Sequence, residues 1–229
     1  MLAGRDISTT KMAFGSSRVM GTCSVGGQAV GTAAAMAARY GCTPRQMSEH
    51  MDELQQKLLR DDCYLPGFSN HDTADKARTA IISASGWTGG NEPEKVINGV
   101  SRAVGEESNC WEAALGAEGA SITLELDAMV KIRELQLTFD PNLSREIMPS
   151  LTKNVRDRQV KGMPVELVKD YSVRMLRNGS EVFSTHIKDN YQRVNHVVPD
   201  KGVQCDQIVI TVYNTHGIDR ARIFEIRAY

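Results

Sequence analysis

The sequence predicts a mainly β protein, in which an antiparallel β-sandwich follows a two-helix, α-helical N-terminal segment. Residues 18–40 consist mostly of Ala, Gly, Met, Thr and Val and carry almost no charge, which is typical of a helix that is buried nearly all round. After about residue 70, short runs of alternating apolar and β-branched residues recur without helical patterns between them. Such runs favour an antiparallel sandwich.

The composition is ordinary for a globular protein of one large domain or two small ones. The 229 residues are 41% hydrophobic and 24% charged, with a formal net charge of −1, so bulk electrostatics attracts neither nucleic acid nor an anionic membrane. No apolar stretch is long enough to span a bilayer, and the first residues lack the pattern of a signal peptide. We therefore expect a soluble protein without a nucleic-acid partner or a membrane span.

The cysteines favour a cytoplasmic or other reducing compartment. None of the five belongs to a C-x-x-C pair, and none has metal-type spacing to a histidine. Reduced, buried thiols are the expected state, and a single disulfide is the alternative. The five are Cys23, Cys42, Cys63, Cys110 and Cys205.

Two helices are predicted in the N-terminal part. Gly41 ends the first, and Thr43 with Pro44 begins an amphipathic second helix over residues 45–60. The change of pattern that follows predicts a boundary between a helical segment, 1–66, and the sandwich, 67–229.

Two further predictions concern the region before the first helix and the surface of that helix. Residues 1–8 read as the end of a strand, and a polar loop follows through Ser17. The apolar helix has no polar stripe to face water, so it must cover its surface against another element or another copy. This predicts a homo-oligomer formed through the apolar helix.

Five strands are predicted in the second part, and Asn178-Gly179 between two of them is a strong hairpin signal. The polar stretch 141–164 is either a structured functional loop or a mobile one. The predicted strands cover 121–126, 132–139, 171–176, 181–186 and 208–213.

A set of motifs near the start carries the first family resemblance. The motifs, in order, are Gly4-Arg5-Asp6, Ser17-Arg18-Val19-Met20 and Gly27-Gln28-Ala29-x-Gly31. They resemble the C-terminal, flavin-contacting segment of bacterial FAD-dependent oxidoreductases of the fumarate-reductase-like and glucose-inhibited-division-like superfamily. The resemblance implies cofactor contacts by Arg5 and Asp6 near the ribityl or pyrophosphate chain. It also implies that a helix N-terminus beside the flavin stabilises the negative charge of the reduced ring, with contacts from Ser17, Arg18, Val19 and Met20.

The chain departs from that family in one decisive respect. No G-x-G-x-x-G motif, which cradles the dinucleotide pyrophosphate, occurs in the sequence. We therefore expect the C-terminal portion of an FAD-dependent oxidoreductase that is not catalytic by itself and does not hold FAD alone. Simple packing is the alternative explanation of the apolar helix.

A second ordered set of motifs resembles the discoidin, or coagulation factor 5/8 type C, family. That family has a galactose-binding-like β-sandwich, and many of its members bind glycans or phospholipid through loops at one end. The motifs are Val96-Ile97-Asn98-Gly99, Cys110-Trp111, 121–127, 131–135, 170–179 and Ile223-Phe224-Glu225-Ile226.

Two tryptophans and one asparagine are the residues to weigh for ligand binding. Trp87 and Asn91 lie on a glycine-rich loop, where an exposed ring serves as a platform for a sugar. The alternative is that Trp87 covers an edge of the sandwich. Trp111, at the start of a strand in the family pattern, is expected in the core.

The resemblance also implies a structural calcium ion. The ligands would be Asn98 and the hydroxyl of Ser101 in the turn and Glu225 on the last strand, since calcium prefers oxygen donors. Asn98 stands where the family has aspartate, which removes one negative charge. The alternative role of Glu225 is a hydrogen bond to the neighbouring turn.

Three functions remain open on the sequence. The first is an accessory sandwich on an FAD-dependent oxidoreductase, with a flavin-domain partner. The second is an independent carbohydrate-binding, lectin-like module with a glycan partner, and the third is a purely structural sandwich that braces a flavin domain. No catalytic residue is predicted, because no Ser/His/Asp, paired-carboxylate or zinc pattern stands out.

Overall fold

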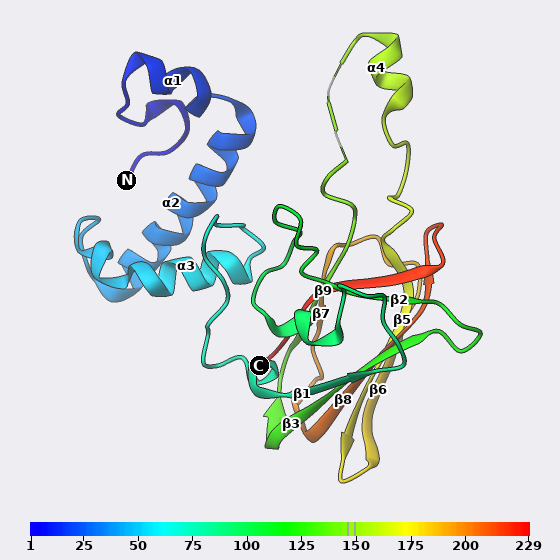
Figure 1. Cartoon of the computed structure of the whole chain (residues 1–229). Coiled ribbons are helices and arrows are strands. Elements are labelled where there is room, and N and C mark those ends of the chain that lie inside the picture. Colours follow the sequence, from blue (N-terminus) through cyan, green and yellow to red (C-terminus); the bar gives the residue numbers. More distant parts are fainter. Residues whose placement is uncertain (146, 149) are drawn as a thin grey trace. The chain divides into compact units, whose positions relative to one another are not determined.

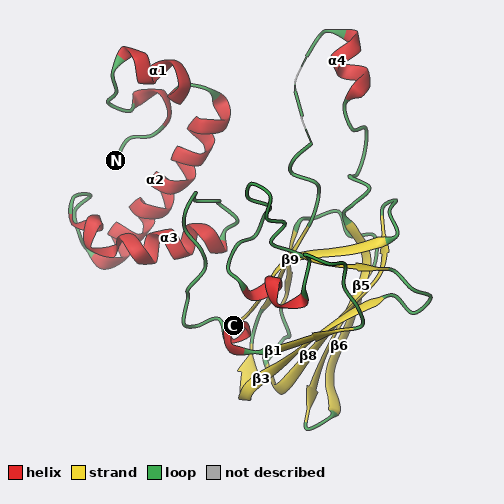
Figure 2. Ribbon diagram, in the orientation of Figure 1, coloured by secondary structure: helices red, strands yellow, loops and turns green. Residues whose placement is uncertain are grey.

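The computed structural model describes residues 1–145, 147–148 and 150–229, and it divides into two units, Met1–His71 and Asp72–Tyr229 (Figure 1). The first unit is helical and the second carries all the strands (Figure 2). Each unit has a hydrophobic core of its own.

The helical unit consists of α1 (Lys11–Ser17), α2 (Met20–Tyr40) and α3 (Met51–Arg60). Gly41 ends α2 in the left-handed conformation, with φ 63°, and donates its N–H to carbonyls of the last turn. The predicted helix and its glycine stop are therefore confirmed, but its predicted burial nearly all round is wrong: only Ala33, Met36 and Ala37 of α2 are buried, because the unit covers one face of the helix, and Met20 is 85% exposed.

The core of this unit is small. One face of α2, around Met36, packs against Leu54 and Leu58 of α3, which confirms the amphipathic spacing of the second helix. The predicted helix start at Thr43 and Pro44 is wrong: a 3-10 helix begins at Gln46 after Arg45, and α3 begins only at Met51, while the hydroxyl of Thr43 accepts a hydrogen bond from the N–H of Gln46 at 3.4 Å in the turn that precedes them. Residues 46–50 of the predicted second helix are therefore a 3-10 helix rather than part of the α-helix.

The first residues differ from the prediction. A 3-10 helix, Gly4–Asp6, stands where the end of a strand was predicted, and α1 replaces the predicted polar loop. A strand needs a partner to satisfy its backbone groups, and the described residues of this unit form none. The side chain of Thr10 accepts a hydrogen bond from the N–H of Ala13 at 3.3 Å and so caps α1.

The second unit is an antiparallel β-sandwich, as predicted. Its two sheets contain five and four strands, and every pair of neighbours is antiparallel. The first sheet has the order β1 (Ile81–Ala84), β3 (Ala120–Ile132), β8 (Val203–Thr215), β5 (Val168–Arg177), β6 (Ser180–Ile187), and the second has the order β2 (Trp111–Ala114), β9 (Arg220–Ala228), β4 (Leu135–Phe139), β7 (Val194–Val197).

Alternation along the strands builds the core between the sheets. Leu124 and Ile210 of the first sheet and Ile223 of the second are fully buried, and burial of each such side chain contributes about 1.5–3 kcal/mol. The residues between them point to the outer faces. On β9 this alternation places polar side chains outside the four-stranded sheet, where the candidate site lies.

The hairpin predicted at Asn178-Gly179 is present between β5 and β6. Both residues have positive φ, 50° and 76°, as a type I′ turn requires. Four of the five predicted strands lie within longer strands, and the fifth, 132–139, is found only in part, because Ile132 ends β3 and β4 begins at Leu135.

The connection from β4 to β5 contains α4 (Lys153–Arg158), which Figure 1 shows well away from the sheets. At the base of this connection Glu166 joins its two ends, accepting hydrogen bonds from Asn142 Nδ2 at 2.8 Å and Arg145 Nη2 at 2.6 Å. The part that the structure describes therefore has an ordered base. Glu146 and Pro149, which belong to the predicted loop, lie outside the described residues.

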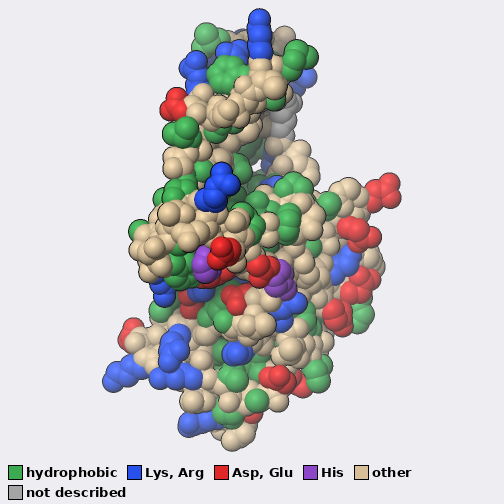
Figure 3. Space-filling view, turned by 90° about the vertical axis from the view of Figure 1, so that its left-hand side faces the viewer, with side chains coloured by type: hydrophobic (Ala, Val, Ile, Leu, Met, Phe, Trp, Pro, Cys, Tyr) green, Lys and Arg blue, Asp and Glu red, His purple; other side chains and the backbone are tan. Residues whose placement is uncertain are grey.

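The surface and the cysteines both agree with what the composition predicts. In the face shown in Figure 3, hydrophobic side chains are interspersed with charged and other ones. Among the residues described, no helix is both long and apolar enough to cross a membrane. All five cysteines are free thiols.

Candidate functional site

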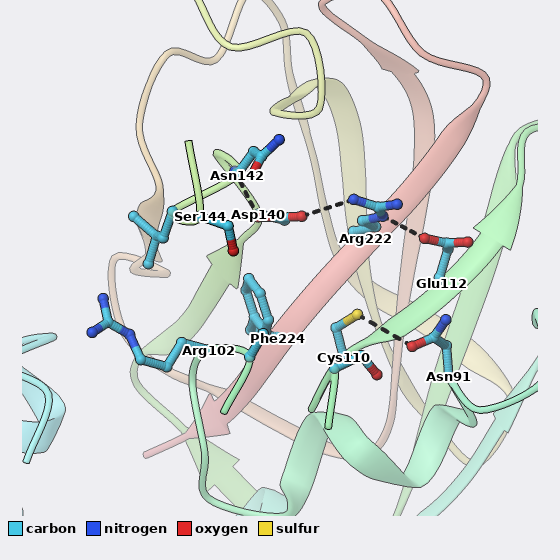
Figure 4. Close-up of a pocket in the computed structure, with 12 residues that line it drawn as sticks. Asn91, Arg102, Cys110, Glu112, Asp140, Asn142, Ser144, Arg222 and Phe224 are labelled. Atoms are coloured by element: carbon cyan, nitrogen blue, oxygen red, sulfur yellow. Dashed lines mark hydrogen bonds and ion pairs between the residues drawn. The ribbon is translucent and has the colours of Figure 1, made fainter. Parts of the chain in front are cut away.

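A hollow of about 370 Å³ opens on the sandwich where β2, β4 and β9 meet two loops (Figure 4). Its size suits a single small polar ligand such as a sugar ring. It is lined by Asn91, Arg102, Ala103, Ser108, Cys110, Glu112, Asp140, Asn142, Leu143, Ser144, Arg222 and Phe224.

The period of two along β9 places the central residues of this hollow. Ala221 and Ile223 are fully buried between the sheets. Arg222, with Arg220 and Phe224 two residues to either side, therefore lies on the opposite, outer face of the strand. On β2, Glu112 lies directly opposite Arg222 in the strand register. Opposite charges in such cross-strand positions attract and fix each other's side chains.

Arg222 is held between two carboxylates. Its Nε donates to a carboxylate oxygen of Glu112, and its Nη1 donates to Asp140 Oδ2 at 3.1 Å (Figure 4). Arg220 binds the other oxygen of Glu112 at 3.0 Å. Burial by itself lowers the pKa of Arg222, but hydrogen bonds and charge from the two carboxylates outweigh it and raise the pKa. The guanidinium is thus a fixed, permanent cation.

Around this triad the hollow offers several hydrogen-bonding groups and one ring. Figure 4 shows Phe224 in the middle, between Arg102 on one side and Cys110 on the other. Asp140 also accepts the N–H of Asn142 at 2.7 Å, which fixes the rim. Guanidinium and amide donors beside carboxylate acceptors and an aromatic face can bind hydroxyl groups and a C–H face.

The thiol of Cys110 lies in the wall of the hollow and is unreactive at neutral pH. It is 5% exposed and donates to Asn91 Oδ1 over a long 3.7 Å contact. Burial, with a smaller contribution from the charge of Asp140, raises its pKa to about 11. Since the thiolate is the nucleophile, Cys110 should react very slowly with alkylating reagents at neutral pH.

This raised pKa predicts a loss of stability in alkali. The unfolded thiol ionises near 9.0 whereas the folded one stays protonated up to about 11, so its contribution is complete below pH 9 and disappears as the pH rises towards 11. The free energy of unfolding should fall by about 2–3 kcal/mol through this group. Urea unfolding from pH 8 to 11 measures the effect, and Cys110→Ala should make the fall shallower by this amount, while Cys205, whose pKa burial also raises to about 11, still contributes. An equally steep fall in that variant would contradict the assignment.

The structure separates the two loop residues that were predicted to bind a ligand. Asn91 lines the hollow, whereas Trp87 is 55% exposed and is not among the lining residues. Trp111 is fully buried and donates its Nε1–H to Gly86 O at 3.0 Å, so its predicted place in the core is confirmed.

The sequence interpretation missed the central residues Glu112, Asp140 and Arg222. A signal for two of them was present. Arg220, Arg222 and Phe224 alternate with apolar residues, which places them on one face of the last strand, and Asp140 follows directly on an apolar strand. Nothing in the sequence indicates that these strands are neighbours.

Two of the predicted calcium ligands, Asn98 and Glu225, already have protein partners. Asn98 Oδ1 accepts the N–H of Val100 at 2.8 Å, and the carbonyl of Ser101 accepts a hydrogen bond from Arg193. Glu225 is buried and forms an ion pair with Arg227, with Oε2 to Nη2 at 2.9 Å. Among the described residues, no group of three or more His, Cys, Asp or Glu side chains could hold a metal ion.

A second hollow, of about 340 Å³, lies in the helical unit. It brings together four of the six residues predicted to contact flavin, and Asp6 and Ser17 are not in its lining. The residue before α2 provides no side-chain cap, so the first N–H groups of the helix are open to a ligand. The lining residues are Arg5, Gly15, Arg18, Val19 and Met20.

Each unit is similar to a different class of known protein. Residues 1–58 match the model of the family "FAD dependent oxidoreductase", which covers about a quarter of the chain. No curated protein matches.

The sandwich is similar in structure to several sugar-binding proteins, at sequence identities that establish the fold alone. A fucose binding module, SpX-3, from Streptococcus pneumoniae has a TM-score of 0.51 and 12% identity, and the match covers 68% of this chain and 96% of that one. The lectin domain of lectinolysin, complexed with Lewis B antigen, has a TM-score of 0.51 and 13% identity over 69% and 97% of the two chains. The family 32 carbohydrate-binding module of Streptococcus pneumoniae EndoD has a TM-score of 0.51 and 15% identity over 68% and 98%. The second unit therefore has the β-sandwich fold of these modules, and residues 1–58 of the first are similar to the FAD dependent oxidoreductase family.

Proposed function

We propose that the sandwich is an accessory carbohydrate-binding unit, joined to a flavin-contacting segment of an FAD-dependent oxidoreductase. The observation that carries the proposal is the hollow in which Arg222 is fixed between Glu112 and Asp140 beside the ring of Phe224. The likeness in fold to a fucose binding module, a lectin domain and a family 32 module supports the same reading.

The polar groups suit neighbouring hydroxyls on a sugar. Arg222 donates and Asp140 accepts, and their 3.1 Å contact places a donor and an acceptor side by side. A pair of vicinal hydroxyls can bind one of each, because a hydroxyl both donates and accepts. The amides of Asn91 and Asn142 add contacts at the rim, and the ring of Phe224, which is 4% exposed, adds an apolar part to the wall.

Glycan-array binding of the whole chain tests this proposal. Two variants of one loop separate the hollow from the exposed ring. Asn91→Ala should weaken binding of the captured glycan about tenfold, in line with the loss of one buried hydrogen bond, and Trp87→Ala should leave the affinity within about twofold. The reverse pattern would move the ligand to the exposed tryptophan. If no glycan is captured, the carbohydrate proposal fails and a structural brace is the better description.

The helical unit supports the flavin part of the proposal. The family match covers all the lining residues of its hollow, and two arginines, Arg5 and Arg18, lie there near the open N-terminus of α2. Such a place favours an anionic group. Because the sequence lacks the phosphate cradle, we expect the purified chain to retain no stoichiometric flavin by itself. Flavin absorbance of the purified protein checks this, and a yellow one-to-one preparation would contradict it.

The surface of α2 supports a homo-oligomer. Met20 is 85% exposed and Val25 is 51% exposed on this apolar helix, and exposed apolar surface favours association. We expect a molar mass above that of the monomer at micromolar concentration in light scattering, and a lower one for Val25→Glu. A monomeric wild type would rule out self-association through α2.

A further inference from the structure

The loop that forms one wall of the hollow is attached to the sheet by Arg193. This residue precedes β7, and its Nη1 donates to the carbonyl of Phe139 at 3.0 Å while its Nη2 donates to the carbonyl of Ser101. Its own backbone carbonyl accepts the N–H of Phe139 at 2.8 Å. The guanidinium also lies over the ring of Phe224, 5.4 Å from its centroid. One side chain therefore joins the loop, β4 and β9.

The loop itself, residues 98–109, is closed by two asparagines. Asn98 Nδ2 donates to Asn109 Oδ1 at 3.0 Å, and Asn109 Nδ2 donates to the carbonyl of Arg102 at 3.1 Å. Arg102, Ala103 and Ser108 of this loop line the hollow. Whatever holds the carbonyl of Ser101 therefore also holds this wall of the site.

A calcium ion would need the oxygen atoms that arginines occupy here. Calcium binds six to eight oxygens, typically carboxylates and backbone carbonyls. Of the predicted donors, Glu225 offers its carboxylate to Arg227 in an almost fully buried pair, and the backbone carbonyl beside the predicted Ser101 hydroxyl binds Arg193. A guanidinium in direct contact with a donor repels a second cation at that oxygen. The donor set present therefore does not fit calcium.

We propose that Arg193 and Arg227 take the place of a structural cation in this sandwich. Arg193 fixes the loop 98–109 against β4 and so positions the wall of the hollow. Arg227 neutralises the buried carboxylate of Glu225. The unit consequently folds and forms its hollow without calcium, and this holds whatever ligand the hollow binds.

Two measurements on the whole chain test this without any sugar. In thermal unfolding of the wild type, the midpoint should be the same within error in calcium chloride and in EDTA, and calorimetric titration with calcium should give no binding heat. In hydrogen exchange, Arg193→Ala should raise exchange about tenfold or more in residues 98–109 and leave β3 and β8 unchanged. Arg174→Ala, which removes an exposed arginine of β5, is the matched control and should leave the loop protected.

The results that would overturn the proposal are distinct. A calcium-dependent rise of several degrees in the unfolding midpoint would show that a metal site exists. Loop exchange in Arg193→Ala equal to that in Arg174→Ala would show that Arg193 does not hold the wall. If Arg193→Ala does not fold, Arg193→Lys keeps the charge but cannot bridge both carbonyls as a planar fork does, and it should show the same local increase to a smaller degree. Wild-type exchange in the Lys variant would count against the proposal.

Discussion

Replacing Arg222 with alanine should lower the free energy of unfolding by about 3–5 kcal/mol, because it leaves two carboxylates without their common partner. The side chains of Glu112 and Asp140 are only 5% and 8% exposed. Without the guanidinium, these two negative charges stay close together in a poorly hydrated place. Urea unfolding at neutral pH measures the loss, and the same variant should no longer capture a glycan.

Arg220 provides the matched control for that substitution. It binds the same carboxylate of Glu112, yet its side chain is 56% exposed, so Arg220→Ala should cost less than about 1 kcal/mol. Arg222→Lys should fall between the two, since an ammonium keeps the charge but cannot donate to both carboxylates in a fixed plane. Equal costs for Arg220→Ala and Arg222→Ala would show that Arg222 is not the centre of the charge cluster.

Local patterns in the sequence were enough to predict most of the fold. Alternation gave the strands, and Asn178-Gly179 gave the hairpin, because both signals depend only on neighbouring residues. The same reasoning failed for residues 1–8, which read as a strand. Whether such a segment pairs in a sheet depends on a partner elsewhere in the chain, and periodicity contains no information on that partner.

The candidate site could be predicted only in part for the same reason. Glu112 and Arg222 are separated by 110 positions and Asp140 and Arg222 by 82, and only the strand register brings them into contact. The set predicted to contact flavin, by contrast, lies within a short stretch, and four of its six members do line one hollow. Residues that are close in the sequence could be grouped from the sequence alone, whereas Glu112, Asp140 and Arg222 could not, although their charges are the more conspicuous feature.

The predicted calcium ligands show a different limit. Residue types at Asn98, Ser101 and Glu225 suit calcium, and nothing in their spacing reveals that an arginine pairs with the carboxylate of Glu225 and another binds the backbone carbonyl of Ser101. A motif lists donors, but the free energy of metal binding depends on which donors remain available after folding. The competing partner of Glu225 is only two residues away, and a lone arginine on a strand gives no sign that it faces inward.

Replacing Trp111 with alanine is the second substitution with a large expected effect. The indole is fully buried at the start of β2 and donates its N–H to the carbonyl of Gly86. Its removal leaves a cavity between the sheets and an unpaired carbonyl, so the free energy of unfolding should fall by about 3–5 kcal/mol. Denaturant unfolding of the whole chain, followed by circular dichroism, measures this loss.

Trp87→Ala is the control, because it removes an indole of the same size from an exposed position on the adjacent loop. Its cost should stay below about 0.5 kcal/mol, as is usual for surface substitutions. A comparable loss in both variants would mean that Trp87 packs on the edge of the sandwich and stabilises it. In that case the loop would be a structural cover, and the hollow beside it would be shaped partly by Trp87 although the ring does not line it.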